Sequence, residues 1–242
     1  MERFKQKLLQ AGIPFRENEP LAAHCTFKIG GPAQLFVQPQ TEQQLCSAAA
    51  LCKEQAVRYY LLGNGSNILF ADEGFAGVVI DISALGSDIA VEGNTLTAGA
   101  GVRLAALCRA ALEHGLSGLE FAYGIPGTVG GAVYMNAGAY GGEMKDVLTV
   151  VRYLTAEGEV VQASAAELDL SYRHSIFEEN GGCILSAQFA LQPGNAADIR
   201  AKMDELMAKR ADKQPLDKPS AGSTFKRPAG AFAAALIDQC GL

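Results

Sequence analysis

Residues 121–142 (FAYGIPGTVGGAVYMNAGAYGG) form a glycine-rich stretch that could bind a phosphate group. The stretch has no charged residue, and seven of its positions are glycine. Glycine loses much conformational entropy on folding, so this density needs a reason. One reason is close approach of the backbone to an anionic ligand, which bare N–H groups can bind. The alternatives are a membrane span, a membrane-type helix-pairing motif at residues 127–131, and a tightly packed turn that binds no ligand.

A second uncharged loop, residues 63–67 (GNGSN), lies between two apolar segments that read as strands, 57–62 and 68–70. Its N–H groups and the Ser66 hydroxyl could hold a pyrophosphate. The alternative is a β-hairpin, because Asn-Gly between strands is a strong hairpin signal. The loop matches neither the Walker A pattern nor the Rossmann glycine pattern. A ligand with two phosphates that bridges both loops is therefore expected to be FAD rather than ATP, held by main-chain amides in place of positive side chains.

Two further segments carry side chains suited to binding anions or moving protons. Arg173 stands among aromatic and apolar residues, where a guanidinium could hold a carboxylate or stabilise an oxyanion. The alternative is an arginine that lies along the protein rim. Residues 219–228 (PSAGSTFKRP) place hydroxyls beside a glycine bend, so Ser223 could donate a proton, whereas the alternative is an ordinary turn. No Gly-x-Ser-x-Gly motif surrounds Ser223, which disfavours a serine hydrolase.

Composition limits the classes of function. The chain has 242 residues, of which 49% are apolar and 19% charged, as in globular proteins. Its net charge of −6 argues against a nucleic-acid partner. The six cysteines form no C-x-x-C motif and the three histidines are scattered, so no metal site is expected. The N-terminus lacks the apolar core of a signal peptide, and we expect a cytoplasmic protein with free thiols.

Local patterns predict the elements that must position these residues. Thr41 and Gln44 predict a capping box at the start of a helix of about 13 residues. Strands and helices follow one another without regular alternation, which favours an α+β fold over a doubly wound parallel sheet. A domain boundary is expected near residue 193, before a mixed-charge helix. The expected helices are 2–11 (with Phe4, Leu8 and Leu9 on one side), 102–114 (with Leu104, Leu107, Cys108, Ala111 and Leu112 on its apolar face), 164–169, 196–212 and 230–239. The expected strands are 34–38, 57–62, 77–82, a hairpin over 88–100 that turns at Gly93 and Asn94, 146–154, 158–163 and 183–191.

The chain resembles the UDP-N-acetylenolpyruvoylglucosamine reductase family over nearly all of its length. The matching motifs are residues 26–33 (TFKIGGPA), 62–67 (LGNGSN), 124–140 (GIPGTVGGAVYMNAGAY), 172–173 (YR) and 220–226 (SAGSTFK). The resemblance implies a p-cresol-methylhydroxylase-type FAD-binding domain over residues 1–192, then a smaller, incomplete α+β substrate-binding domain over 193–242. It implies that FAD and NADPH are the cofactors and that UDP-N-acetylglucosamine-enolpyruvate is reduced to UDP-N-acetylmuramate in peptidoglycan synthesis. Neither a nucleic acid nor a membrane is an expected partner.

The same resemblance implies roles for individual residues. Arg173 matches the arginine that stabilises the enolate, and Ser223 matches the serine that protonates C2. Tyr172, Lys213 and Lys226 match substrate-binding positions, with Lys213 near the substrate diphosphate. The residues expected to hold FAD are Gly63, Asn64, Gly65, Ser66, Asn67, Pro126, Gly127, Thr128, Gly130, Gly131, Asn136 and Gly138.

The chain departs from this family pattern in two ways. Between Arg173 and Ser223 it is short, like the family branch that lacks an extra tyrosine-bearing loop. The family also continues beyond Leu242, and that part carries a catalytic glutamate, so this chain is expected to be truncated and to turn over little by itself. Two other functions stay open: a flavin-binding fragment without reductase activity, and another FAD oxidoreductase of the same fold. Covalent attachment of the flavin would favour the latter, and we expect non-covalent FAD.

Overall fold

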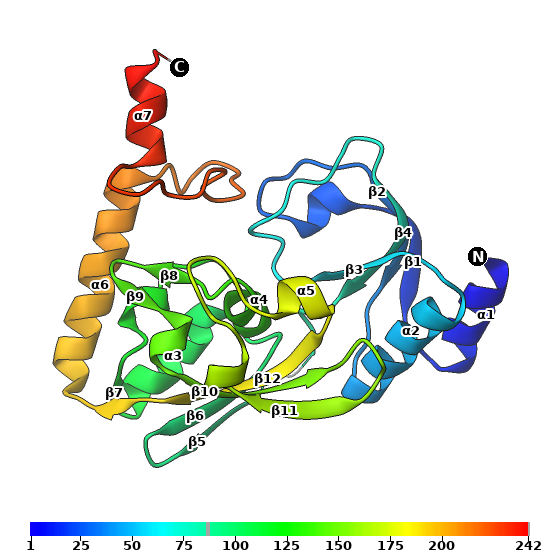
Figure 1. The fold of residues 1–242 in the computed structure, drawn as a ribbon, viewed down its shortest axis with the longest axis horizontal. Helices are drawn as coiled ribbons and strands as arrows, with labels where there is room; N and C mark the ends of the chain where they lie inside the picture. Colours follow the sequence, from blue (N-terminus) through cyan, green and yellow to red (C-terminus); the bar gives the residue numbers. More distant parts are fainter. Residues whose placement is uncertain (86–87, 242) are drawn as a thin grey trace.

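Two β-sheets and the helices packed on them form the body of the protein (Figure 1). The structure, a computed structural model, describes residues 1–85 and 88–241. Strands and helices follow one another without regular alternation, which confirms the α+β class. Within those two ranges, no helix has both the length and the apolar character needed to cross a membrane.

The first sheet has four strands in the order β1-β2-β4-β3. Strand β1 pairs antiparallel with β2, whereas β2 and β3 each pair parallel with β4. Two parallel neighbours cannot be joined by a hairpin, so the hairpin alternative for residues 63–67 is wrong. Residues 68–70, expected to be a strand, have no regular structure. The strands are β1 (Phe15–Pro20), β2 (Pro32–Val37), β3 (Tyr59–Leu62) and β4 (Phe75–Asp81).

The second sheet has five strands in the order β11-β10-β12-β6-β5, and all neighbouring pairs are antiparallel. The predicted hairpin over residues 88–100 is confirmed, and Gly93 adopts φ +58° at its turn. Helix α4 (Val129–Tyr134), which lies within the glycine-rich stretch, packs on β12. The strands are β5 (Ile89–Glu92), β6 (Thr95–Gly99), β10 (Leu148–Leu154), β11 (Val160–Ser164) and β12 (Cys183–Ala190).

The three longest helices before residue 193 are α1 (Glu2–Gln10), α2 (Glu42–Glu54) and α3 (Leu104–Glu113). All five residues predicted for the apolar face of α3 are buried. The Thr41 hydroxyl accepts the predicted capping bond from Gln44 N at 3.2 Å. The Gln44 side chain, however, accepts from Gln40 N at 2.7 Å rather than from Thr41 N, so the expected capping box is only half formed.

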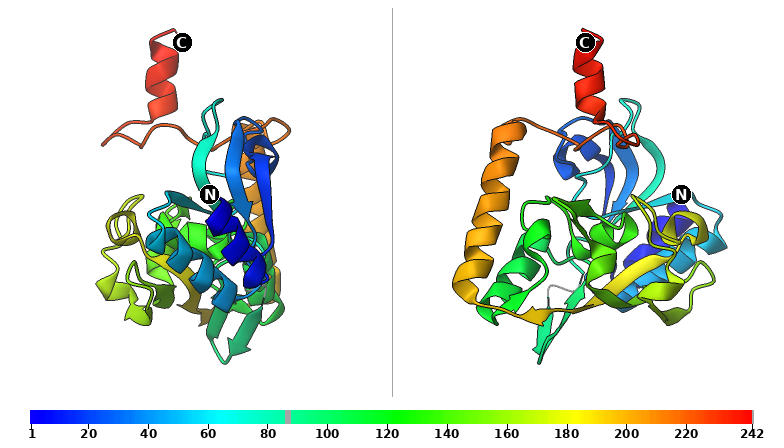
Figure 2. Two further views of the ribbon diagram at one scale, coloured as in Figure 1. Left: turned by 90° about the vertical axis from the view of Figure 1, so that its right-hand side faces the viewer. Right: turned by 60° about the vertical axis from the view of Figure 1, so that its left-hand side comes forward.

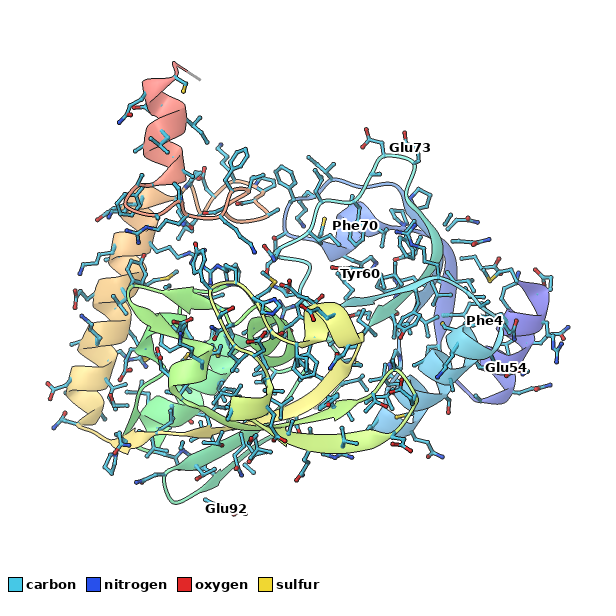
Figure 3. All side chains as sticks on the ribbon, viewed as in Figure 1. Phe4, Glu54, Tyr60, Phe70, Glu73 and Glu92 are labelled. Atoms are coloured by element: carbon cyan, nitrogen blue, oxygen red, sulfur yellow. The ribbon has the colours of Figure 1, made fainter. Side chains whose placement is uncertain are left out.

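The prediction for the apolar face of α1 was wrong at one position. Phe4, labelled in Figure 3, and Leu8 are buried, but Leu9 is 67% exposed. Phe4 and Leu8 are one helical turn apart and share a face. Leu9 follows Leu8 by one position, which turns its side chain about 100° away from that face.

Short elements connect the sheets, and two helices follow them. The helix expected over 164–169 is a single 3-10 turn, η4 (Ala165–Glu167). Helix α6 (Ala196–Lys213) runs along one side of the molecule, and α7 (Ala233–Gln239) stands away from the body with no buried residue (Figures 1 and 2). The other short elements are η1 (Leu21–His24), β7 (Leu116–Ser117), η2 (Glu120–Ala122), β8 (Gly138–Ala139), β9 (Gly142–Glu143), η3 (Met144–Asp146), α5 (Phe177–Asn180) and β13 (Gln192–Pro193).

One hydrophobic core joins both sheets. It includes Phe4 of α1, Ile80 of β4, Leu107 of α3, Phe189 of β12 and Met203 of α6. Burial of one such side chain stabilises the fold by roughly 1.5–3 kcal/mol. The domain boundary expected near residue 193 stays a prediction.

A smaller cluster lies beside residues 63–67. It includes Leu62, which precedes the loop, and Phe70, which follows it, and both are buried. Tyr60 and Phe70 meet edge to face with their ring centroids 6.1 Å apart (Figure 3). Apolar packing therefore holds the chain on either side of this loop.

Candidate active site

A cavity of about 910 Å³ opens where the two predicted loops meet the segment after α6. Its wall includes Gly63 and Asn64 from one loop, Gly124 and Pro126 from the other, and Ser223 from the segment after α6. Sites for small molecules and cofactors typically measure roughly 300–1,000 Å³. The fold therefore gathers three distant parts of the sequence around a space that is large enough for a cofactor.

The two loops contact each other directly. The side-chain amide of Asn64 donates a hydrogen bond to the main-chain carbonyl of Pro126. A Cβ atom on Gly63 would lie 2.7 Å from Oγ1 of Thr128, so only glycine allows this approach without a shift. Thr128 is buried, and its hydroxyl caps α4 by accepting from Gly131 N at 3.4 Å. The loops thus pack as one unit.

The first loop contains backbone donors without a protein acceptor. In the described part of the chain, no protein group accepts a hydrogen bond from the N–H groups of residues 64–67. The first turn of α4 already uses its donors, because Val129 N bonds Val102 O at 2.8 Å and Gly130 N bonds Ala100 O at 2.9 Å. Unpaired N–H groups in a loop can bind an anion. Residues 64–67 therefore offer the donors that a phosphate needs.

Packing within the protein explains part of the glycine density in residues 121–142. A Cβ atom on Gly130 would lie 2.9 Å from Cβ of Ala100, and one on Gly142 would lie 2.7 Å from the ring of Phe121. These two glycines are needed whether or not a ligand binds. At Gly127 the nearest atom to a Cβ would be 3.7 Å away, an ordinary contact, so protein packing does not require glycine there.

Asn136 connects the glycine-rich stretch to the loop of Arg173. Its buried side chain donates from Nδ2 to Glu143 Oε2 at 2.6 Å and to Ser171 O at 2.9 Å. Its Oδ1 accepts from Lys145 N at 2.9 Å. The side-chain amide of Asn136 is thus fully hydrogen bonded to protein groups, and its bond to Ser171 O holds the backbone just before Arg173.

Arg173 is half-buried and adopts φ +57°, a left-handed conformation that is costly for a side chain other than glycine. Its Nη2 donates to Gly138 O at 2.9 Å, and its guanidinium carbon lies 5.5 Å from the centroid of the Tyr172 ring. Strained residues of this kind cluster at functional sites. The bond to Gly138 O restricts the orientation of the guanidinium.

Ser223 lies on the exposed segment between α6 and α7. A pair of hydrogen bonds attaches this segment to the body: Ser220 N donates to Thr26 O at 3.1 Å, and Thr26 Oγ1 donates to Ser220 O at 2.6 Å. Lys213 ends α6, and Lys226 follows Ser223, with both lysines exposed to solvent.

The sequence-based prediction missed the positive side chains on the cavity wall. Arg210 of α6 is half-buried there, and burial lowers the pKa of its guanidinium, which still stays charged. Among the described residues, neither Arg103 nor Arg210 forms an ion pair with a carboxylate, whereas Arg16 and Arg152 do. One signal was available for Arg210, since it follows the buried Met203 by two helical turns and so shares its face. The positive residues on the wall are Lys28, Arg103, Arg210 and Lys218, and the acidic ones are Asp81 and Asp217.

Four of the predicted site residues line this cavity together, namely Gly63, Asn64, Pro126 and Ser223. The other predicted positions lie outside its wall, and their roles stay predictions. They are Gly65, Ser66, Asn67, Gly127, Thr128, Gly130, Gly131, Asn136, Gly138, Tyr172, Arg173, Lys213 and Lys226.

Comparison with known proteins gives consistent matches. A family model described as FAD binding domain matches residues 33–164, and one described as UDP-N-acetylenolpyruvoylglucosamine reductase, C-terminal domain, matches residues 214–242. The chain is 47% identical over 227 residues to the UDP-N-acetylenolpyruvoylglucosamine reductase of Clostridium novyi (strain NT), covering 94% of this chain and 74% of that protein. The corresponding protein of Agathobacter rectalis is 49% identical over 251 residues, with 98% and 78% covered.

Solved structures agree with these matches. The crystal structure of UDP-N-acetylenolpyruvylglucosamine reductase (MurB) from Thermus caldophilus has a TM-score of 0.80 and 34% identity, covering 95% of this chain and 80% of that one. Wild-type BBE-like 1 from Physcomitrella patens has a TM-score of 0.58 and 20% identity, covering 78% and 44%. At that identity the second likeness concerns the fold alone.

Proposed function

This chain belongs to the UDP-N-acetylenolpyruvoylglucosamine reductase family, and from this premise we propose that it reduces the enolpyruvyl group of UDP-N-acetylglucosamine-enolpyruvate. The product is UDP-N-acetylmuramate, a precursor of peptidoglycan, and NADPH is the reductant. The reaction takes place in the cytoplasm. The observation that carries the proposal is the cavity that residues 63–64, Pro126 and Ser223 line together.

The residues around this cavity fit FAD. Its volume of about 910 Å³ suits a large cofactor, and the N–H groups of residues 64–67 have no protein acceptor in the described chain. These amides would hold the pyrophosphate at the edge of the cavity that Asn64 lines, and Arg103 and Arg210 would add positive charge from the cavity wall. Bound FAD supplies the hydride transfer from NADPH to the enolpyruvyl group.

Arg173 and Ser223 would act on the substrate. The guanidinium of Arg173, held by Gly138 O at 2.9 Å, would bind the carboxylate of the enolpyruvyl group and stabilise negative charge that develops there. The hydroxyl of Ser223 would donate a proton to C2. A serine hydroxyl is a weak acid, but a strongly basic carbon beside it can take its proton.

Flavin absorbance tests the function and the role of Ser223 separately. The purified protein should contain FAD that acid or heat releases, and NADPH should bleach it. In a version extended to the full length of the relatives, of which this chain covers 74%, the enolpyruvyl nucleotide should then restore the colour. In Ser223→Ala, NADPH should bleach the flavin at the wild-type rate, whereas reoxidation by the nucleotide should be about 10²–10⁴ times slower. The control is Ser47→Ala, which removes a hydroxyl bonded to Gln43 O on α2.

Two outcomes would contradict these expectations. A protein that stays colourless after added FAD would not be the proposed flavoenzyme. If Ser223→Ala slowed both half-reactions equally, Ser223 would not be the proton donor.

A further inference from the structure

The segment that carries Ser223 has few attachments to the rest of the protein. We call residues 214–232 the serine segment. Among the described residues, it hydrogen bonds to the chain before α6 at two places, Thr26 and Tyr172. At Tyr172 a single bond of 3.2 Å runs from Arg227 N to the phenol oxygen. At Thr26 two bonds hold Ser220, which precedes Ser223 by three residues, so Thr26 is the attachment nearer to the proposed proton donor.

Thr26 also holds the loop with the free amides. Its N–H donates to Gly65 O at 3.0 Å, and its hydroxyl lies 3.4 Å from the same oxygen. Gly65 adopts φ +63°, and a Cβ atom there would lie 2.2 Å from His24 O, so the loop is tightly packed against the turn that contains Thr26. One residue therefore bonds both the loop at 63–67 and the serine segment.

The bonds continue from Ser220 toward Ser223. The Ser220 hydroxyl accepts from Gly222 N at 3.1 Å, which orients the turn just before Ser223. Thr26, Ser220, Gly222 and Ser223 all line the cavity. The Thr26 hydroxyl has one proton, and the shorter distance of 2.6 Å directs it to Ser220 O.

We propose that Thr26 is a positioning residue that couples ligand binding at residues 63–67 to the placement of Ser223. This inference rests on the proposed function. An anion bound to the free amides orders the loop, the Gly65 carbonyl then holds Thr26, and the Thr26 hydroxyl holds the Ser220 peptide. Thr26 contacts no reacting atom in this scheme and acts through Ser220.

Thr26→Val is a suitable test because valine has nearly the same shape and lacks only the hydroxyl. The main-chain bonds from Thr26 to Gly65 and Ser220 remain possible in this variant. Thr26→Ser keeps the hydroxyl and should behave as the wild type. Thr149→Val is the matched control, because the Thr149 hydroxyl donates to Gln188 O at 3.0 Å on the second sheet, away from the cavity wall.

Hydrogen–deuterium exchange measures the coupling without any turnover. Exchange in the peptide over residues 220–225 is compared without FAD and with FAD at saturation for each variant. In the wild type, Thr26→Ser and Thr149→Val, FAD should slow this exchange by roughly three- to tenfold. This factor corresponds to the net free energy of one hydrogen bond. In Thr26→Val the change should be less than about twofold. Equal FAD-induced protection in Thr26→Val and the wild type would overturn the inference while leaving the proposed function intact. A wild-type chain that binds no FAD would overturn both.

Half-reactions give a second measurement. Thr26→Val should slow reoxidation of the flavin by the enolpyruvyl nucleotide by about 10–100-fold, because a small misplacement of a reacting group is costly. Reduction by NADPH should stay within about threefold of the wild type, since it does not use Ser223. Equal slowing of both steps would assign Thr26 a merely structural role.

Discussion

The side-chain amide of Asn64 donates a hydrogen bond to the main-chain carbonyl of Pro126, and this bond joins the loop after β3 to the stretch before α4. Both residues line the cavity. The two loops come from different parts of the sequence, and neither has a charged side chain to attract the other. Their contact therefore depends on this bond and on the packing of Gly63 against Thr128.

Replacing Asn64 with alanine should weaken FAD binding. The change removes the bond between the loops and leaves the Pro126 carbonyl without this partner, which costs about 1–2 kcal/mol. We expect the dissociation constant for FAD to rise roughly 5–30-fold, measured by quenching of flavin fluorescence. Asn195→Ala is the control, because it removes the N-cap of α6 at the end away from the cavity. It should lower stability by about 1 kcal/mol and leave FAD binding unchanged. An unaltered FAD affinity in Asn64→Ala would show that the loops keep their arrangement without this bond.

Two glycines with nearly the same backbone conformation should respond differently to alanine. Gly65 has φ +63° and Gly93 has φ +58°, but a Cβ atom would lie 2.2 Å from His24 O at Gly65 and would meet nothing within 4 Å at Gly93. Gly93→Ala should therefore cost only the strain of the left-handed conformation, about 1–2 kcal/mol. Gly65→Ala adds a backbone clash, and its total cost should be about 2–4 kcal/mol with loss of FAD binding. Urea unfolding and flavin titration measure both effects, and equal costs would disprove the clash.

Arg210 on α6 should contribute to binding of anionic nucleotides. Arg210→Met keeps an unbranched side chain against Gly124, whose Cβ would lie 3.2 Å from Cδ of Arg210, and removes the charge from the cavity. We expect at least one of FAD, NADPH and the enolpyruvyl nucleotide to bind about tenfold more weakly, with less dependence on salt. Arg200→Met removes a charge from an exposed position of the same helix and should change none of these affinities. If all three dissociation constants matched the wild type, Arg210 would have no binding role.

The ion pair between Glu42 and Arg152 should make stability depend on pH. The bidentate hydrogen bonds of 2.5 Å from Arg152 lower the pKa of the Glu42 carboxyl below its ordinary value of 4.5. A carboxyl with a lower pKa in the folded state adds stability above pH 4.5, and this contribution is lost as the pH falls through the folded pKa. Glu42→Gln should thus cost at most about 1 kcal/mol at pH 7, because the pair is partly exposed.

Urea unfolding of wild type and Glu42→Gln from pH 7 to pH 3 measures this difference. It should be constant down to about pH 5.5 and shrink below pH 4.5. Glu113→Gln, at an exposed position on α3, is the control and should show no such trend. A difference that grew as the pH fell would contradict the assigned sign.

Local patterns in the sequence predicted the elements whose cause lies within a few residues. The cap at Thr41, the turn at Gly93 and the apolar face from Leu104 to Leu112 follow from bonds and periodicity along a short piece of chain. The two glycine-containing loops and Ser223 were also visible, since their residue types are unusual wherever they lie. The hairpin alternative for residues 63–67 could not be settled in this way, because its local signal is real and is overridden by parallel pairing of β3 with β4.

The sequence by itself determined the α+β class and most of the helices and strands, because backbone propensities and motif spacing act over short distances. It also predicted two loops as phosphate-binding candidates, and that binding stays a prediction. Only the tertiary structure decided which glycines are required by packing, as Gly130 is by its contact with Ala100. It also decided which backbone amides have no protein acceptor, as is the case for residues 64–67 in the described chain. It alone brought Arg210 to the cavity wall and Ser220 to Thr26. These contacts join residues far apart in the chain, and their distances depend on how sheets and helices pack around a shared core rather than on any neighbour in sequence.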